Sequence, residues 1–578
     1  MTIKSIISKH IKKVLNIIKI FITHEDLAIV RTSDKKVWDY QVNGIIKLAN
    51  NLNKNPYVLS KYIISNMRYY EYKMYKKITA SKLGFINIFI NKTWLEKELT
   101  KKIKSFRLGI KKVTPKNIII DYSSPNVAKK MHVGHLRSTI LGDATARILE
   151  FLGHNVMRIN HIGDWGTHFG MIIAYLKQNF ISYNEINQLD LNELYQKAKV
   201  NFDLDSEFSK KTRNYVVKLQ KKDKECIRIW KKIVKKTITE NQKIYKKLNV
   251  TLTNKHIVGE SFYNDMLPDI IQDLKTKKIA KQCNGAYIVF LNKFKNRDGA
   301  PMGVIIQKQD GAFLYSTIDL ACLKYRCEVL RADQILYFID SRQKEYLKQI
   351  LEIAKKAGYI SNNIIIRHNE FGMICSKNKR PFSTRSGNNI ILSDLINEAI
   401  KRAKKIAKNK NKNLSNKELE YLSEKIGIGA IKYFDLSKNR LTDYIFKWDE
   451  ILTFDGNTAP YMQYAYIRIL SIFKKLNISM LKLSGNIILT ELLENKLAIK
   501  LFQFEEIILE SLQHSAPHII CKYLYELSKI FSKFYEKCSI YKSKNTKIRK
   551  NRLLLSLLTA RTLKKGLFII GISTIKYM

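Results

Sequence analysis

The sequence predicts an α/β protein with a parallel-sheet domain in the middle and an all-helical segment at the carboxyl end. Ile118, Ile119 and Ile120 form a short apolar run typical of a buried strand, and a turn-rich loop and a helix follow it. After Asn457, apolar residues recur at helical spacing almost to the end of the chain. The length of 578 residues suits three or four domains, and a hydrophobic fraction of 45% with only 8 Pro excludes disorder for most of the chain.

Residues 1–115 are predicted to form a small α+β domain. Its first helix has apolar residues at helical spacing, namely Ile7, Ile11, Val14, Leu15, Ile18 and Phe21. Lysines interrupt this segment too often for a secretory signal or a membrane span, and a docked helix is favoured over a helix on a membrane surface. Residues 84–90 alternate as a strand does. These features predict a cytoplasmic protein without a membrane partner.

Residues 116–455 are predicted to form the α/β domain, with a Lys-rich helical insertion near residues 208–248. That basic run can follow a nucleic-acid backbone or be a solvated helix face, and the second interpretation is favoured for most of it. Residues 456–578 are predicted to form an all-α bundle. Its apolar stripes are more typical of a core than of a ligand site, and they comprise Leu497, Leu501, Phe504, Ile508, Ile520, Leu524, Leu527, Phe531 and Phe534.

The net charge of +53 has two explanations, and composition alone leaves both open. A polyanionic partner is one, because clustered Lys and Arg displace counterions from phosphate backbones. Compositional drift is the other, because Lys, Ile and Asn are all abundant, as AT-rich coding would produce. Of the 103 basic residues, 82 are Lys and 21 are Arg, which favours a large contribution from drift.

The cysteine and histidine patterns do not predict a metal site. The seven Cys are scattered without a C-x-x-C pair, so reduced thiols are expected and zinc is not. His154, His161 and His168 are evenly spaced, but they straddle Gly-rich loops.

The segment after the first buried strand carries the strongest chemical signal. The strand ends at Asp121, a loop of Ser, Pro and Asn follows, and the run His132-Val133-Gly134-His135 opens a helix. A helix that begins beyond a strand end presents free N–H groups to phosphate, and two imidazoles on one side of its first turn can donate further hydrogen bonds. By spacing alone, however, two capping or metal-binding His in an ordinary turn are an equally good interpretation.

Longer motifs around this run favour the functional interpretation. H-V-G-H after S-S-P-N resembles the HIGH signature of class I aminoacyl-tRNA synthetases, and the chain as a whole resembles the arginyl-tRNA synthetase family. The resemblance covers nearly the whole chain, most weakly in residues 1–115. It rests on residues 125–171 and on LYSTIDLACLKYR (314–326), YFIDSRQ (337–343), PFSTRSG (381–387), GIGAIKYFDLSKNRLTDYIFKWD (427–449), GNTAPYMQYAYIRIL (456–470) and TARTLKKGLFIIGI (559–572).

This resemblance implies a Rossmann-type catalytic domain between an N-terminal domain that contacts tRNA and a helical domain that reads the anticodon. It also implies an arginine–tRNA ligase. The arginine carboxylate would attack the α-phosphate of ATP to give arginyl-adenylate and pyrophosphate, and the 2′-hydroxyl of the terminal tRNA adenosine would then take the arginyl group. The expected partners are arginine, ATP with Mg²⁺ and arginine tRNA, and the expected state is a monomer. Positioning and electrostatic stabilisation would supply the catalysis.

For the ATP site, the motif match assigns His132 and His135 to the reacting phosphates and Gly134 to the face of adenine. The segment from His368 to Met373 is similar to the family segment whose backbone meets adenine. The assigned ATP contacts are Pro125, Gly134, His368 and Met373.

For the arginine site, the match assigns Tyr315 and Asp319, which lie four residues apart and would project to one side of a helix. A carboxylate is a good acceptor for a guanidinium. Asn126 would hold the ammonium or carboxylate end of the amino acid, and Gln343 would be another member of the pocket. Without the match, these four residues would be interpreted as a packed tyrosine, a surface or capping carboxylate, a turn residue and a polar surface residue.

The chain departs from the family pattern in three places. In the mobile loop that replaces KMSKS, Arg385 remains to meet pyrophosphate, but Ser383 stands where relatives carry Lys. Lys129 matches a family Lys that compensates for the incomplete loop, with Lys130 and Lys379 as nearby alternatives. Gln282 stands at the position aligned with a family acidic residue, so the guanidinium pocket is expected to lose one charge. Finally, Lys576-Tyr577-Met578 ends a chain whose relatives often have Arg before Met.

Two alternatives to an arginine–tRNA ligase stay open at this point. One is another class I synthetase, such as the cysteine-specific branch, but the Tyr315 and Asp319 pair and the lack of a zinc-forming set argue against it. The other is a decayed RNA-binding protein, which Ser383 and Gln282 favour and which intact His132, Gly134, His135 and Arg385 oppose.

Overall fold

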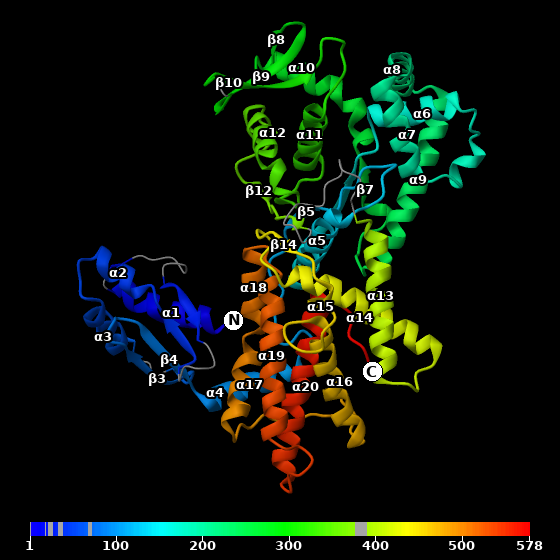
Figure 1. Cartoon of the computed structure of the whole chain (residues 1–578). Helices are drawn as coiled ribbons and strands as arrows, with labels where there is room; N and C mark the ends of the chain where they lie inside the picture. Colours follow the sequence, from blue (N-terminus) through cyan, green and yellow to red (C-terminus); the bar gives the residue numbers. More distant parts are fainter. Residues whose placement is uncertain are drawn as a thin grey trace. The chain divides into compact units, whose positions relative to one another are not determined.

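The computed structural model describes residues 2–17, 19–20, 27–32, 38–67, 72–296, 298–375 and 390–577. The chain folds into two compact units (Figure 1). The central unit consists of Val113–Leu452 and Ile569–Ile572, and the terminal unit consists of Met1–Lys112, Thr453–Phe568 and Ser573–Met578. The predicted division at residues 115 and 455 stays a prediction.

A five-stranded parallel sheet forms the middle of the central unit, which confirms the predicted α/β class. Its strand order is β12-β11-β5-β6-β7. The buried run of isoleucines lies in β5, as predicted, between β11 and β6. The strands are β5 (Asn117–Asp121), β6 (Asn155–Ile162), β7 (Ile257–Gly259), β11 (Gln334–Tyr337) and β12 (Ile365–His368).

Helices and a small antiparallel sheet complete the central unit (Figure 1). The small sheet has the order β10-β9-β8, and β13 pairs with β14. The strands of the small sheet are β8 (Lys281–Cys283), β9 (Ala286–Lys295) and β10 (Pro301–Gln307), and the separate parallel pair consists of β13 (Ile374–Cys375) and β14 (Tyr444–Ile445). The helices are α5 (Val133–Leu152), α6 (Thr167–Gln178), α7 (Leu191–Leu204), α8 (Ser206–Gln220), α9 (Lys224–Lys247), α10 (Leu267–Thr276), α11 (Tyr315–Lys324), α12 (Lys344–Lys356), α13 (Leu392–Lys410), α14 (Asn416–Leu436) and α15 (Trp448–Ile451).

Helix α5 packs in the interior of the central unit, and most of its residues are buried. Gly142 permits close packing on β5, because a Cβ there would lie 2.3 Å from the ring of Tyr122. The helix ends at Gly153, whose φ of 102° is left-handed and therefore suits glycine. The predicted Lys-rich helix is two helices, α8 and α9, separated by residues 221–223.

In the terminal unit, the N-terminal part is a four-stranded antiparallel sheet with helices, as the α+β prediction requires. The strand order is β1-β2-β4-β3, and the predicted strand is β4. The buried apolar residues of α1 include the first four of the predicted stripe, whereas Ile18 and Phe21 lie outside the described residues. The elements are α1 (Ile3–Ile17), β1 (Ile29–Arg31), β2 (Tyr40–Val42), α2 (Ile45–Asn51), α3 (Pro56–Asn66), β3 (Tyr75–Ala80), β4 (Ile86–Ile90) and α4 (Lys92–Lys104).

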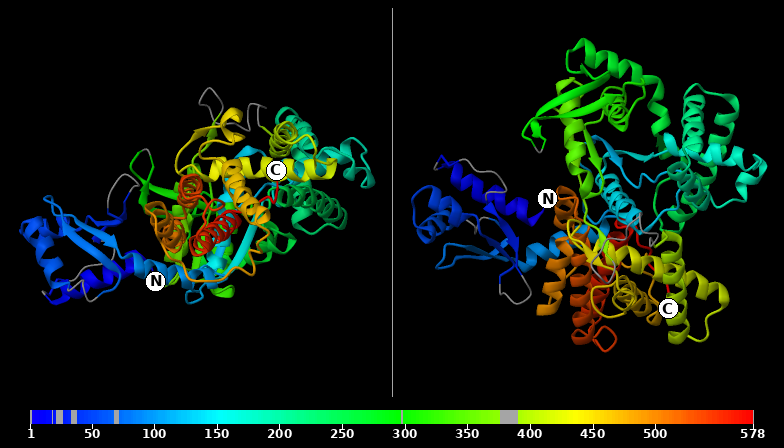
Figure 2. Two further views of the ribbon diagram at one scale, coloured as in Figure 1. Left: turned by 90° about the horizontal axis from the view of Figure 1, so that it is seen from below. Right: turned by 45° about the horizontal axis from the view of Figure 1, so that its top comes forward.

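The rest of the terminal unit is the predicted helical bundle, orange to red in Figure 2. The residues of its predicted stripes are buried, which confirms that they form the core. Near the start of the bundle, Tyr466 is buried and Tyr464 is exposed. None of the helices in the described part of the chain is long and apolar enough to cross a membrane. The helices are α16 (Ala459–Lys475), α17 (Leu492–Phe502), α18 (Phe504–Gln513), α19 (His518–Lys537) and α20 (Thr546–Ile569).

Candidate active site

Three of the segments that carry predicted site residues follow the carboxyl ends of parallel strands, whereas Tyr315 and Asp319 lie on α11, which follows β10. Because these ends meet at one edge of the sheet, the segments come together although they are far apart in the sequence. The loop with Pro125 and Asn126 follows β5, the turn with Gln343 follows β11, and the segment that ends at Met373 follows β12. Glu260 follows β7 directly.

The loop between β5 and α5 is held by hydrogen bonds to neighbouring strands. Ser124 donates its N–H to Asn160 Oδ1 at 3.0 Å and its hydroxyl to Asp121 Oδ1 at 3.0 Å. The carbonyl of Pro125 accepts from the N–H of Gly163 at 3.3 Å. Asn126 packs against that glycine, where a Cβ would lie 2.3 Å from its amide oxygen. The loop therefore has a defined shape before any substrate binds.

The two histidines of the HVGH run form a reciprocal cap at the start of α5. The Nδ1 of His132 accepts the N–H of Gly134 at 3.1 Å, and the Nδ1 of His135 accepts the N–H of His132 at 3.1 Å. A ring nitrogen that accepts a hydrogen bond carries no proton, so each neutral ring bears its proton on Nε2. Both rings thus keep an Nε2–H donor for another partner.

Both histidines are neutral near pH 7. Burial, and to a smaller extent the neighbouring His132, lowers the pKa of His135 to about 3. The pKa of His132 is also lowered, first by burial and then by the positive charges of Arg342 and Lys129. The site therefore has two uncharged hydrogen-bond donors at a helix N-terminus, and the cations Arg342 and Lys129 act on His132.

Residues 390–392 are attached to the start of α5. The N–H of Val133 donates to the carbonyl of Ile390 at 3.0 Å, and the N–H of Leu392 donates to the carbonyl of Met131 at 2.9 Å. The chain therefore re-enters the described structure directly beside the HVGH turn. Arg385, Ser383 and Lys379 lie outside the described residues.

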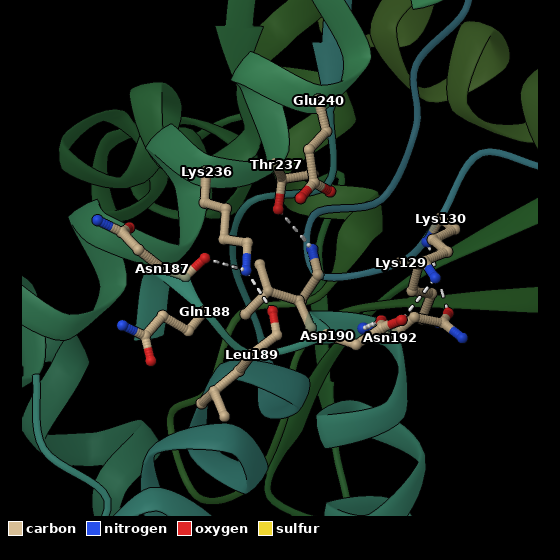
Figure 3. A pocket seen from close by; sticks show the side chains of 12 residues that line it. Lys129, Lys130, Asn187, Gln188, Leu189, Asp190, Asn192, Lys236, Thr237 and Glu240 are labelled. Atoms are coloured by element: carbon tan, nitrogen blue, oxygen red, sulfur yellow. Dashed lines mark hydrogen bonds and ion pairs between the residues drawn. The ribbon is translucent and has the colours of Figure 1, made fainter. Parts of the chain in front are cut away.

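Lys129 and Lys130 line a polar cavity of about 340 Å³ beside the β5–α5 loop (Figure 3). The Nζ of Lys129 lies 4.5 Å from the ring centroid of Tyr195, and the Nζ of Lys130 pairs with Asp190 at 2.5 Å. Since Lys129 also lowers the pKa of His132, its charge acts on the HVGH turn. The positive charge of Lys130 is already paired with the carboxylate of Asp190.

The segment after β12 is tied to the residues that follow α14. The Nε2–H of His368 donates to the carbonyl of Ile339 at 3.0 Å. Both backbone groups of Met373 are occupied: its N–H donates to Asp443 Oδ1 at 2.6 Å, and its carbonyl accepts from the N–H of Tyr444 at 3.1 Å. Met373 thus has its half-buried side chain left for a substrate contact.

Tyr315 and Asp319 lie one turn apart on α11, as predicted. Tyr315 is 62% exposed, and Asp319 accepts the hydroxyl of Tyr346 at 2.5 Å on Oδ2. Burial raises the pKa of Asp319 to about 6. Gln343 is exposed in the turn that precedes α12, the helix that carries Tyr346.

A second carboxylate beside Asp319 was not predicted from the sequence. Glu260 begins the short helical segment η5 (Glu260–Met266), and η5 packs on α11. Burial raises the pKa of Glu260 to about 8, and the nearby negative charges of Asp319 and Asp164 contribute. Asp164 anchors the segment by accepting both the N–H and the hydroxyl of Ser261, at 2.9 and 2.7 Å. In the sequence, Glu260 stands between Gly259 and Ser261, and no motif or spacing there indicates a binding residue.

Gln282, the position expected to cost the pocket one charge, is an exposed residue of β8 that pairs with Tyr287. Glu260 and Asp319 interact electrostatically, so two carboxylates act on each other here whatever stands at position 282. The described residues contain no group of three or more His, Cys, Asp or Glu placed to hold a metal ion.

Comparison with known families accounts for this arrangement. A model of the catalytic domain of class I tRNA synthetases (R) matches residues 97–448, and a DALR anticodon-binding domain matches residues 462–578. The N-terminal domain of arginyl-tRNA synthetases matches residues 1–90. The chain belongs to the arginyl-tRNA synthetase family. The resemblance inferred from the motifs is thereby confirmed, and the cysteine-specific alternative is wrong.

Individual members of the family are similar along their whole length. The chain is 56% identical to an arginine–tRNA ligase of Buchnera aphidicola and 49% identical to that of Haemophilus influenzae, with full coverage of both chains in each case. The crystal structure of the arginyl-tRNA synthetase of Plasmodium falciparum is 31% identical, has a TM-score of 0.84 and is covered completely. The Thermus thermophilus enzyme, 20% identical with a TM-score of 0.81, shares the fold.

Proposed function

We propose that this site activates arginine with ATP and passes the arginyl group to the 2′-hydroxyl of the terminal adenosine of arginine tRNA. One observation carries the proposal: a capped helix start with two imidazole donors follows β5, and Glu260, which interacts with Asp319, follows β7 at the same edge of the sheet. The first feature suits phosphate and the second suits a guanidinium. Family membership supports the same reaction.

In the first step, a carboxylate oxygen of arginine attacks the α-phosphorus, and the bond from that phosphorus to pyrophosphate breaks. Negative charge shifts to phosphate oxygens and to the leaving pyrophosphate. We assign the Nε2–H groups of His132 and His135 to this charge, because neutral donors that are already oriented need no reorganisation as it develops. Mg²⁺ enters with ATP, held mainly by phosphate oxygens, as is usual for this ion.

Lys129 supplies a positive charge to the same place. Its charge acts on His132, whereas Lys130 is paired with Asp190, so Lys129 is the better candidate to replace the lysine that position 383 lacks. Arg385 is proposed to meet pyrophosphate on the motif match alone. Pro125, Gly134, His368 and Met373 are proposed to surround the nucleotide, with Met373 contributing its side chain.

For arginine, Asp319 and Glu260 are proposed to bind the guanidinium, with Tyr315 beside them. One oxygen of Asp319 is held by Tyr346, so the carboxylate is oriented and Oδ1 remains for the substrate. Asn126 and Gln343 are proposed to bind the α-amino and carboxylate end. The monomeric state and the cytoplasmic location stay predictions.

The reaction is tested by ATP–pyrophosphate exchange with arginine, measured with and without arginine tRNA. Exchange that requires arginine is expected, and the family resemblance implies that tRNA is needed for it. If neither condition gives exchange, the catalytic proposal fails and the RNA-binding alternative stands. Exchange with cysteine but not with arginine would refute the assigned amino acid.

A further inference from the structure

A short segment near the end of the chain, within the residues that the anticodon-binding domain matches, belongs to the central unit. The family model of that domain matches residues 462–578, yet Ile569–Ile572 pack within the central unit. We call these four residues the tail. Its three isoleucines are each at most 2% exposed, so the tail is docked in a core and not lying on a surface. The tail thus belongs to the core of the central unit, although the residues before and after it in the chain belong to the terminal unit.

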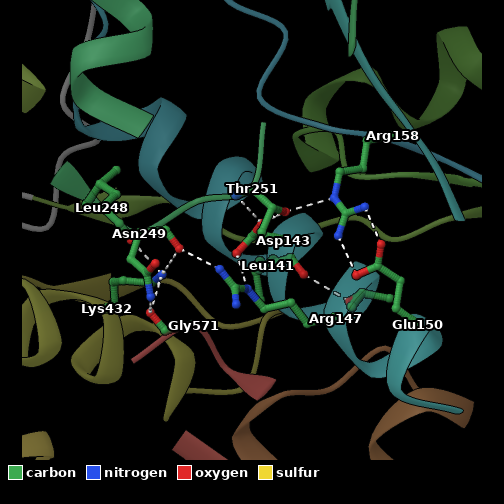
Figure 4. Close-up of polar contacts among 11 residues, drawn as sticks. Leu141, Asp143, Arg147, Glu150, Arg158, Leu248, Asn249, Thr251, Lys432 and Gly571 are labelled. Atoms are coloured by element: carbon green, nitrogen blue, oxygen red, sulfur yellow. Dashed lines mark hydrogen bonds and ion pairs between the residues drawn. The ribbon is translucent and has the colours of Figure 1, made fainter. Parts of the chain in front are cut away.

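A buried lysine holds the tail (Figure 4). Lys432 of α14 is fully buried, and its Nζ donates to the carbonyl of Gly571 at 2.8 Å and to that of Leu248 at 2.7 Å. Asn249 also donates its side-chain amide to the carbonyl of Gly571, at 3.1 Å. A buried ammonium needs such acceptors, because water cannot reach it.

Gly571 is suited to this contact in two ways. Its φ of +71° is left-handed, and a Cβ at this position would lie 2.5 Å from the Nζ of Lys432. A side chain at position 571 would therefore require the Nζ of Lys432 to move from its present position.

The ammonium of Lys432 also interacts with the helix that the HVGH run opens. Burial lowers the pKa of Lys432 to about 7, and Asp143 of α5 opposes this shift by favouring the charged form. The same carboxylate pairs with Arg147 at 2.8 Å and accepts the N–H of Thr251 at 2.7 Å. The charge that holds the tail is thus compensated by a carboxylate of α5.

One turn further along α14, a second buried contact leads to the nucleotide side of the site. Asp435 pairs with Arg137 of α5 at 3.2 Å, and both side chains are 1% exposed. Arg137 donates to the carbonyls of Gly372 and Thr442, at 2.7 and 3.0 Å. Gly372 precedes Met373 in the segment proposed to meet adenine.

We propose that Lys432 is a positioning residue through which the tail of the anticodon-binding domain controls the active site. With the tail docked, Lys432 sets the position of α14, and Asp435 and Arg137 transmit that position to α5 and to the segment at Gly372. With the tail undocked, the ammonium loses an acceptor and α14 must readjust. Transfer RNA bound to the helical domain acts on α20 and so biases the tail between these two states. The inference rests on the proposed function.

The test compares Gly571→Ala with Gly358→Ala in the full chain. Gly358 has a φ of +76° and open space around its Cβ position, so this control carries the same backbone strain without a contact to Lys432. Lys432→Met, with exposed Lys417→Met on the same helix as its control, tests the other partner. Far-UV circular dichroism checks folding, and Gly571→Ala suffices if Lys432→Met does not fold.

The readouts are kcat of exchange with and without arginine tRNA, KM for ATP, and the Kd for tRNA from filter binding. Both test variants should lower kcat with tRNA about tenfold or more and bring the ratio of the two rates toward one, with the Kd for tRNA nearly unchanged. The controls should behave as the wild type. A weaker Kd with unchanged kcat would overturn the inference, since the tail would then serve tRNA binding alone.

The inference and the proposed function fail in different ways. If the wild type itself shows no exchange, the proposed function is wrong. If the wild type is active and Gly571→Ala matches Gly358→Ala in every readout, the function stands and the role of the tail is refuted.

Discussion

Replacement of Glu260 by Gln tests whether the arginine pocket ionises its second carboxylate when the guanidinium arrives. The pKa of Glu260 is raised to about 8, chiefly by burial and then by Asp319 and Asp164. At pH 7 this carboxyl group is therefore about nine-tenths protonated in the free enzyme. Glutamine has nearly the same shape as the protonated acid, so Glu260→Gln should leave the empty pocket almost unchanged.

The effect should appear on arginine binding and should grow with pH. A guanidinium favours the ionised carboxylate, and a hydrogen bond to a charged group contributes about 1.5–3 kcal/mol. At pH 7, ionising a group with a pKa near 8 costs about 1.4 kcal/mol, which leaves a net effect of about 0–1.6 kcal/mol, or up to about 15-fold in KM for arginine. At pH 9 that cost disappears, and the variant should lose about 10- to 150-fold.

The assay is KM for arginine in ATP–pyrophosphate exchange between pH 6.5 and 9, for the wild type, Glu260→Gln and exposed Glu420→Gln as a control. The ratio of variant to wild type at each pH removes the titration of arginine itself. Because the ionised form binds, the affinity of the wild type should be lost as pH falls through about 8, and that of the variant should not. A ratio that stays near one at pH 9 would refute the reasoning, since Glu260 would then bind in its neutral form or lie outside the pocket.

Three further predictions concern the other parts of the site. Asp319→Ala should raise KM for arginine about 10- to 150-fold with little change in KM for ATP, and equal effects on both would place Asp319 outside the arginine pocket. His132→Ala should lower kcat of exchange about 10²- to 10³-fold with KM for arginine nearly unchanged, whereas an unchanged kcat would remove this histidine from the reacting phosphates. Arg137→Met leaves Asp435 buried without its cation and should lower the free energy of unfolding in urea by about 3–5 kcal/mol, and a loss below about 1 kcal/mol would contradict the role given to this pair.

The sequence predicts well those parts of the site whose local structure depends on residues close together in the chain. The end of β5 at Asp121 and the start of α5 at His132 follow from a short apolar run, a turn-rich loop and an apolar helical stripe, all within one segment. The reciprocal cap of His132 and His135 requires only their spacing. Tyr315 and Asp319 likewise share a helical turn, so their common side could be predicted without knowing the sheet.

Glu260 could not be found in this way, because its role depends on the sheet and not on its neighbours. It follows a strand of three residues, too short to produce a periodic pattern, and the carboxylates that raise its pKa come from the turn after β6 and from α11. Only the parallel pairing of β6 with β7 brings the turn after β7 beside Asp164. An alignment by motif instead pointed to Gln282, which lies in the small antiparallel sheet.

Lys432 could not be predicted from the sequence for a different reason: nothing in the sequence distinguishes it from the many other lysines. In a chain with 82 Lys and a net charge of +53, compositional drift explains an exposed lysine without further argument. Drift does not explain a fully buried one, since an ammonium without acceptors in a core costs several kcal/mol. Burial lowers the pKa of Lys432 to about 7, but the carbonyls of Leu248 and Gly571 accept hydrogen bonds from its Nζ and Asp143 favours its charged form. These partners are distant in the sequence. Burial with acceptors from separate segments therefore distinguishes a lysine with a specific role from the compositional background.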